Sequence, residues 1–159
     1  RIRRIEEKPG LPVRGGFDPV YGWINRPGTW LAEGVEQHIN SIGARGRREP
    51  EPEPEPGVLR GACFGESYTF GSEVLDGEDW PEQLHQLAAR LEVLNLGNSG
   101  WGTDQALMLW REIGADLDAD VVFVGLLLEN IRRNVNLYRS FAYPDTTGLV
   151  VKPRYRFGS

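Results

Sequence analysis

Short apolar runs alternate with helical patterns between residues 58 and 128, and this alternation constrains the fold more than any other feature of the chain. The apolar runs cover residues 58–64, 93–96 and 121–128. Strands that are apolar on both faces are typical of parallel sheets, in which helices connect one strand to the next. The order therefore predicts an α/β fold in which helices cover both faces of a parallel sheet through right-handed crossovers.

Two helices are predicted between these strands. The first begins at Asp79, which can cap it, with Pro81 in the first turn and Glu82 three residues after the cap. The second follows Thr103. Each pattern places apolar residues on one helical face: Leu84, Leu87, Ala88 and Leu91 in the first, and Ala106, Leu109, Trp110 and Ile113 in the second.

A repeated Glu-Pro dipeptide divides the chain. It occupies residues 49–56, where proline fixes φ and removes the amide donor, so we predict an extended spacer over 49–57. Residues 1–48 are rich in Gly, Pro, Trp and Tyr, which predicts an N-terminal extension of turns and short strands. Residues 58–159 then form the sheet domain, and its last thirty residues are predicted as loop or turn.

Composition narrows the functional classes. The net charge is −5, which argues against nucleic acid as the main partner, because phosphate binding requires a basic surface. The single cysteine, Cys63, lies in an apolar run, so it is predicted to be a buried hydrophobe. No apolar stretch reaches the roughly 20 residues of a membrane helix. We expect the chain to be a fragment of a longer product, so the compartment stays open: cytoplasmic, or extracytoplasmic if a signal or membrane anchor lies upstream.

Small and polar residues follow each predicted strand, at residues 65–67, 97–100 and 129–130. The carboxyl ends of parallel strands lie at one edge of the sheet, where ligands bind in such folds. Acyl transfer needs a nucleophile and donors for the oxyanion. Ser67 can be the nucleophile, and the amides of Ser67 and Gly100 with the side chain of Asn130 can be the donors. Trp101, in the loop after the second strand, is predicted to contact the substrate.

These segments closely resemble the SGNH (GDSL-type) hydrolase family, in particular its bacterial members. The Gly-Asp-Ser block of that family appears as Gly65-Glu66-Ser67, its second-block glycine corresponds to Gly100, and its third block covers residues 125–130. The stretch at residues 40–46 is similar to the lead-in of bacterial members. The resemblance covers most of residues 17–155. It implies a flavodoxin-like three-layer α/β/α sandwich that acts on ester-linked acyl groups through an acyl-serine, with no metal or organic cofactor.

The chain departs from the family pattern in three ways. Glu66 replaces the usual aspartate, and Glu129-Asn130 follows three leucines where the family has Gly-X-Asn-Asp, so the register leaves Glu129 as an alternative to Asn130. The Asp-X-X-His block that supplies the base has no counterpart in the chain. The only histidines, His38 and His85, belong to no family motif. We therefore expect the base, and the C-terminal part of the domain, to lie beyond Ser159.

The sequence thus predicts a serine esterase that hydrolyses carboxylic esters, including acetyl esters, of a small molecule or a glycan. An O-acyltransferase acting on a glycan would use the same groups with a sugar hydroxyl as the acceptor. A non-catalytic binding module is the third interpretation, motivated by Glu66 and the missing base. The acidic residues 76–79 lack the spacing of a calcium loop, so they are interpreted as a helix-entry loop and no metal site is predicted. Arg132 and Arg133 are interpreted as surface charges.

Overall fold

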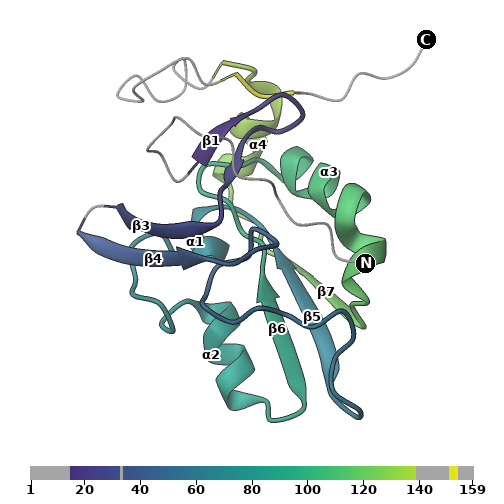
Figure 1. The fold of residues 1–159 in the computed structure, drawn as a ribbon. Helices are drawn as coiled ribbons and strands as arrows, with labels where there is room; N and C mark the ends of the chain where they lie inside the picture. Colours follow the sequence, from purple (N-terminus) through teal and green to yellow (C-terminus); the bar gives the residue numbers. More distant parts are fainter. Residues whose placement is uncertain (1–14, 33, 139–150, 154–159) are drawn as a thin grey trace.

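The computed structural model describes residues 15–32, 34–138 and 151–153 (Figure 1). Two antiparallel hairpins come first: β1 (Gly15–Asp18) with β2 (Gly22–Asn25), and β3 (Gly28–Ala32) with β4 (Val35–Ile39). The strand–helix part follows, and its elements in chain order are β5 (Leu59–Phe64), α1 (Ser67–Phe70), α2 (Trp80–Leu87), β6 (Leu91–Asn95), α3 (Thr103–Ile113), the 3₁₀ helix η1 (Gly114–Leu117), β7 (Val121–Val124) and α4 (Glu129–Val135).

The central sheet has the strand order β6-β5-β7, and both of its pairings are parallel. Cys63 lies in register with Asn95 on one side and with Phe123 on the other. Short loops extend this pairing beyond the strand ends, since the Leu96 amide donates to the Cys63 carbonyl and the Gly125 amide donates to the Phe64 carbonyl, both at 2.8 Å. The chain therefore has the predicted mixed α/β fold with a parallel sheet.

The helices α2 and α3 contact opposite faces of this sheet. Phe123 packs edge-on against Trp80 at the start of α2, with ring centroids 6.2 Å apart. Phe64 packs edge-on against Trp110 of α3, with centroids 5.6 Å apart. Phe123 is in register with Cys63, the neighbour of Phe64, and successive side chains on a strand point to opposite faces. One helix therefore lies over each face.

The boundaries of α2 agree with the predicted capping. Asp79 is the N-cap, and its carboxylate accepts from the Glu82 amide at 3.2 Å, with Pro81 in the first turn. The helix ends at Leu87, earlier than its apolar pattern predicts, and Leu91 belongs to β6 instead. Leu87 is consequently 84% exposed. A helical spacing of leucines does not show where the helix ends, because the turn at residues 88–90 interrupts the pattern.

The N-terminal hairpins are attached to the strand–helix part by buried hydrogen bonds. The Asn25 amide donates to Oδ1 of Asn98 at 2.7 Å, and the side-chain amide of Asn25 donates to the Gly97 carbonyl at 2.9 Å. Nε2 of Gln105, on α3, donates to the Tyr21 carbonyl at 2.7 Å. Tyr21 also belongs to the hydrophobic core. Residues of the hairpins therefore help to shape the loop after β6.

A buried arginine attaches the Glu-Pro stretch to the sheet. Arg60 lies within the apolar run of β5, yet its side chain has no exposed surface. Its guanidinium donates to the carbonyls of Glu51, Pro52 and Leu117 at 2.7–3.0 Å, and its Nε lies 2.6 Å from the Glu92 carboxylate. Residues 49–56 contain no helix or strand, and two of their carbonyls are fixed by this side chain.

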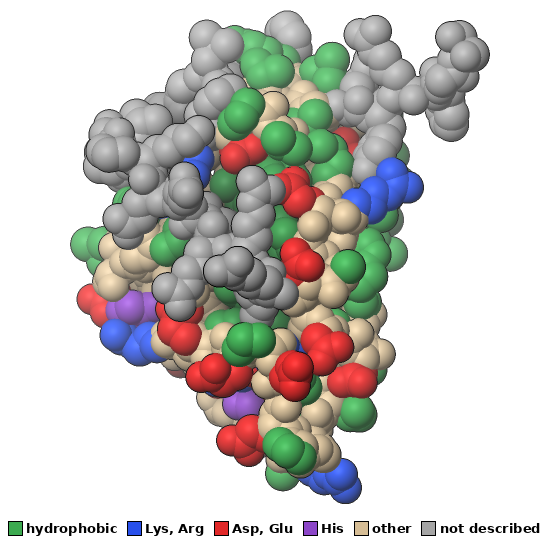
Figure 2. Space-filling model, turned by 45° about the vertical axis from the view of Figure 1, so that its right-hand side comes forward, with side chains coloured by type: hydrophobic (Ala, Val, Ile, Leu, Met, Phe, Trp, Pro, Cys, Tyr) green, Lys and Arg blue, Asp and Glu red, His purple; other side chains and the backbone are tan. Residues whose placement is uncertain are grey.

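Two predictions for the end of the sheet domain are wrong. The run at 121–128 forms a strand only as far as Val124, and it is not buried: Val124 is 55% exposed. Within the described residues β7 pairs on one side only, with β5, and of its four side chains only that of Phe123 is partly buried. Part of the predicted C-terminal loop is helical, since α4 begins at Glu129. On the face of the molecule shown in Figure 2, hydrophobic side chains lie among acidic ones. None of the described helices has the length and apolar character needed to cross a membrane.

The thiol of Cys63 is predicted to be inert in the folded protein. Its side chain is fully buried, and this burial raises the pKa of Cys63 to about 12, with the carboxylate of Asp79 acting in the same direction. At pH 8 on the order of one thiol in 10,000 is then ionised, and only the thiolate attacks disulfides. We expect no reaction with DTNB, a disulfide reagent, under native conditions and one equivalent of thiol after unfolding in guanidinium chloride. Rapid reaction in the folded state would contradict this placement.

Candidate functional site

A glycine lies one or two residues after the end of each strand of the parallel sheet, and α1 packs directly against these glycines. Gly65 and Gly125 both approach Thr69, whose Oγ1 would lie 2.1 Å from a Cβ placed on either of them. Gly97 approaches the backbone of α1 itself, because its Cβ would lie 2.4 Å from the Phe70 nitrogen. Any side chain at these positions would displace α1. The strand-end glycines therefore allow α1 to sit directly on the carboxyl edge of the sheet.

The helix α1 starts at Ser67 and is a single turn. Glu66 is its N-cap and accepts from the Tyr68 amide at 3.2 Å, while Gly71 ends it with a φ of 77°, in the left-handed region that favours glycine. The Ser67 hydroxyl donates to the Glu66 carboxylate at 3.2 Å. Ser67 is half-buried, whereas Glu66 is buried. Glu66 thus holds Ser67 at the carboxyl edge of the sheet, with the Ser67 hydroxyl beside the Glu66 carboxylate.

The second motif segment, at residues 97–100, forms a tight turn after β6. The Trp101 amide donates to the Asn98 carbonyl at 3.2 Å, and Gly100, with a φ of 79°, lies third in this turn. A positive φ at the third position is typical of type II turns and explains the glycine. The turn is joined to the first segment, because the Asn98 amide donates to the Gly65 carbonyl at 3.0 Å and the hydroxyls of Ser72 and Ser99 lie 2.6 Å apart.

The third motif segment, at residues 129–130, lies at the start of α4. Asn130 is buried, and its Oδ1 accepts from the Leu127 amide at 2.7 Å, while Glu129 beside it is exposed. The Asn130 side-chain amide donates to the Trp101 carbonyl at 3.3 Å. Of the two residues that the sequence leaves open, Asn130 is the one whose side chain lies next to the second segment.

Arg133 connects all three segments. Its Nη1 lies 3.7 Å from Oε2 of Glu66 and donates to the Trp101 carbonyl at 3.2 Å, one helical turn after Asn130. The carboxylate of Glu66 therefore faces a cation on one side and the Ser67 hydroxyl on the other. The sequence interpretation of Arg133 as a surface charge is wrong, because its side chain is only 10% exposed. The motif carried no signal for this ion pair, which depends on where α4 begins.

The predicted substrate contact of Trp101 does not fit its position in the structure. Its side chain has no exposed surface, its indole donates to the Trp23 carbonyl at 2.8 Å, and its ring stacks on Tyr21 with centroids 5.6 Å apart. The N-terminal hairpin covers the loop, which the local sequence around Trp101 could not indicate. Trp101 contacts the neighbouring segments through its backbone carbonyl. Trp110, predicted as core, packs against the core from α3.

Neither histidine hydrogen-bonds to Ser67. Nδ1 of His38 pairs with the Asp76 carboxylate, and its Nε2 lies 3.4 Å from Glu36. Nδ1 of His85 lies 2.9 Å from the Leu91 carbonyl. In the described ranges, the side chain that accepts from the Ser67 hydroxyl is Glu66.

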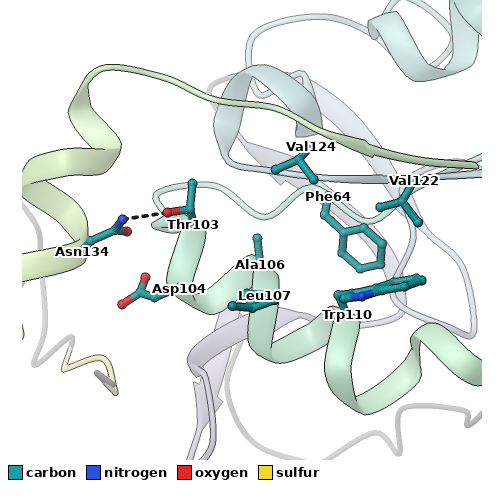
Figure 3. Close-up of a pocket in the computed structure, with 9 residues that line it drawn as sticks. All are labelled: Phe64, Thr103, Asp104, Ala106, Leu107, Trp110, Val122, Val124 and Asn134. Carbon is teal, nitrogen blue, oxygen red and sulfur yellow. Dashed lines mark hydrogen bonds between the residues drawn. The ribbon is translucent and has the colours of Figure 1, made fainter. Parts of the chain in front are cut away.

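Two cavities lie near this edge of the sheet. The smaller, of about 310 Å³, includes Ser67 in its wall together with Tyr68, Gly71, Ser72, Glu73, Val74, Glu78, Asp79 and Trp80. Burial raises the pKa of Asp79, while the hydrogen bond from Asn95 acts in the opposite direction. The larger, of about 520 Å³, lies between α3 and β7 and is mostly apolar (Figure 3). It shares no lining residue with the first. Because Ser67 lines the smaller cavity, that cavity is the candidate site, although neither Gly100 nor Asn130 lines it.

The described residues contain no group of three His, Cys, Asp or Glu side chains placed to hold a metal ion, and the acidic loop at 76–79 is no exception. Asp76 instead contacts His38 and Arg45, and Asp79 caps α2. Comparison with known proteins finds no family model that matches the chain and no similar sequence among curated proteins.

Proposed function

We propose that the protein is a serine esterase of the SGNH type, with Ser67 as the nucleophile. The observation that carries the proposal is the contact between the three motif segments at one sheet edge. Glu66, Trp101 and Asn130 come from the ends of three different strands, and Arg133 and Asn130 both donate to the Trp101 carbonyl. The strand order and the helices on opposite faces are compatible with the three-layer sandwich of that family.

In this proposal the Ser67 oxygen attacks an ester carbonyl at the carboxyl edge of the sheet, beside the 310 Å³ cavity that Ser67 lines. The carbonyl oxygen becomes an oxyanion, which the amides of Ser67 and Gly100 and the side chain of Asn130 stabilise. The first-turn amides of a helix lack intrahelical acceptors, which suits Ser67 at the start of α1. Each such donor contributes about 3–4 kcal/mol to transition-state stabilisation. The alcohol leaves, and water then hydrolyses the acyl-serine.

The proton of Ser67 needs an acceptor more basic than an ordinary carboxylate, because a catalytic base works best with a pKa near the operating pH. Glu66 accepts a hydrogen bond from Ser67, but its carboxylate also caps α1 and lies beside Arg133, so it is already engaged in holding the local structure. We therefore assign Glu66 to orienting the hydroxyl. In this proposal an Asp-X-X-His block, which has no counterpart among the 159 residues, supplies the base.

Covalent labelling of the full-length protein tests the proposal. A fluorophosphonate probe should modify Ser67, as identified by peptide mass spectrometry, and Ser67→Ala should abolish the labelling. Ser72→Ala is the matched control, because Ser72 lines the same cavity but its hydroxyl pairs with that of Ser99. This variant should be labelled like the wild type. Absence of labelling in a folded wild-type protein would refute an esterase mechanism.

A non-catalytic binding module is the second candidate, and the positions of the histidines favour it. Both are engaged elsewhere, with Asp76, Glu36 and the Leu91 carbonyl. In that case the full-length protein would bind an ester or a glycan without turnover, and Ser67→Ala would bind it with unchanged affinity. Hydrolysis of p-nitrophenyl acetate that disappears in Ser67→Ala would exclude this candidate.

A further inference from the structure

The stretch at residues 40–46 precedes the strand–helix part and has no role in the chemistry described above. Its first residue, Asn40, organises a tight turn. Oδ1 of Asn40 accepts from the amides of Ile42 and Ala44 at 3.2 and 2.9 Å, and the Asn40 amide donates to the Ala44 carbonyl at 2.8 Å. Gly43 occupies the left-handed region, with a φ of 83°. An asparagine that bonds to nearby backbone in this way fixes the direction of the chain that follows.

The turn places the Arg45 side chain in the interior, against the C-terminal end of α1. The Arg45 amide donates to the Asn95 carbonyl of β6 at 2.8 Å, and its side chain has no exposed surface. The guanidinium lies over the Phe70 ring, 5.0 Å from its centroid. Its Nε lies 3.3 Å from Asp76 and 3.6 Å from Asp79. The buried cation is therefore compensated by two carboxylates and an aromatic face.

The remaining donors of Arg45 bind the backbone of one loop. Nη1 donates to the carbonyls of Phe70 and Gly71, and Nη2 donates to the Val74 carbonyl at 2.6 Å. Gly71, Val74 and Asp79 line the cavity that contains Ser67. One side chain thus contacts the C-terminal end of α1 and much of the wall of the cavity.

We propose that Arg45 is a positioning residue that fixes residues 70–79 as the wall of the Ser67 cavity. The role of Arg45 in catalysis rests on the proposed function. The set of contacts between Arg45 and residues 70–79, called the clamp below, is a property of the fold. Arginine suits the position because its planar group directs several donors to separate acceptors, whereas a lysine ammonium is a compact point charge. Lysine at this position keeps the charge but cannot reach the three carbonyls together.

Hydrogen exchange tests the clamp without reference to activity. In Arg45→Lys and Arg45→Met, the amides of Ser72, Val74 and Glu78 should exchange at least tenfold faster than in the wild type, because their hydrogen bonds lie within the clamped loop. The Leu96 amide, bonded to the Cys63 carbonyl in the sheet, is the internal reference. Exchange of the loop that changes only in proportion to Leu96 would overturn the proposal. If Arg45→Met does not fold, Arg45→Lys decides the result.

The matched control is Arg48→Met. Arg48 comes from the same stretch of chain and also forms ion pairs, with Glu82 and Glu92, but among the described residues none of its side-chain hydrogen bonds or ion pairs reaches residues 70–79. Its substitution should leave the loop amides unchanged relative to Leu96.

The labelling kinetics separate this inference from the proposed function. In the full-length protein, Arg45→Lys should raise the concentration for half-maximal labelling by a fluorophosphonate at least fivefold and change the maximal rate less. The reason is that the cavity wall binds the probe while Ser67 supplies the chemistry. An unlabelled wild type would refute the esterase, and the exchange data would still decide the clamp. Unchanged kinetics in a variant with a loosened loop would overturn the positioning role.

Discussion

Substitution of Arg60 by methionine is expected to lower the free energy of unfolding by about 3–5 kcal/mol, the range for removing one partner of a buried ion pair. Arg60 has a fully buried side chain that binds Glu92 and three carbonyls. Methionine fills the space of the aliphatic stem but leaves these acceptors without a donor. Urea unfolding followed by circular dichroism measures the loss.

Arg48→Met provides a control on the same carboxylate. Nη1 of Arg48 lies 3.7 Å from Glu92, but 34% of its side chain is exposed, against none for Arg60. Ion pairs that reach solvent contribute roughly 0–1 kcal/mol. We expect Arg48→Met to cost far less than Arg60→Met. Equal losses from the two variants would show that the burial of Arg60 is not what makes it important.

Gly97→Ala is expected to destabilise the fold by about 3 kcal/mol, at the upper end of the range for overpacking, and to abolish labelling of Ser67. The new Cβ would lie 2.4 Å from the Phe70 nitrogen and 2.9 Å from the Thr69 carbonyl carbon. Backbone atoms cannot rotate away as the end of a side chain can, so α1 must move as a unit. Thermal unfolding and the labelling rate of the full-length protein report the two effects.

Gly34→Ala separates steric collision from backbone strain. Gly34 has a φ of 82°, and a Cβ added there would have no atom within 4 Å, so alanine meets only the roughly 1–2 kcal/mol cost of the left-handed conformation. It lies in the β3–β4 hairpin, remote in sequence from α1. We expect normal labelling of Ser67 in Gly34→Ala. If Gly97→Ala also keeps normal labelling, α1 does not depend on the strand-end glycine.

Local patterns were sufficient for the elements that depend on neighbouring residues. The cap formed by Asp79, the strand of residues 59–64 and the helix after Thr103 follow from side-chain spacing and capping chemistry, which act over a few residues. The same patterns misplaced the end of β7 and missed α4. Both depend on which surfaces are covered by distant parts of the chain, and a sequence window contains no such information.

In contrast, the environment of the candidate site could not be predicted from local sequence patterns. The sequence alone placed Ser67, Gly100 and Asn130 after three strands, and from this the α/β fold and the candidate nucleophile could be predicted. It did not show that Arg45 and Arg60 are buried, that Arg133 faces Glu66, or that the hairpin removes Trp101 from the surface. Each of these features depends on contacts between different elements of the chain. The burial of a charge or an indole is decided by the partners that the tertiary fold brings to it, because the cost of desolvation depends on those partners and not on the neighbours in sequence.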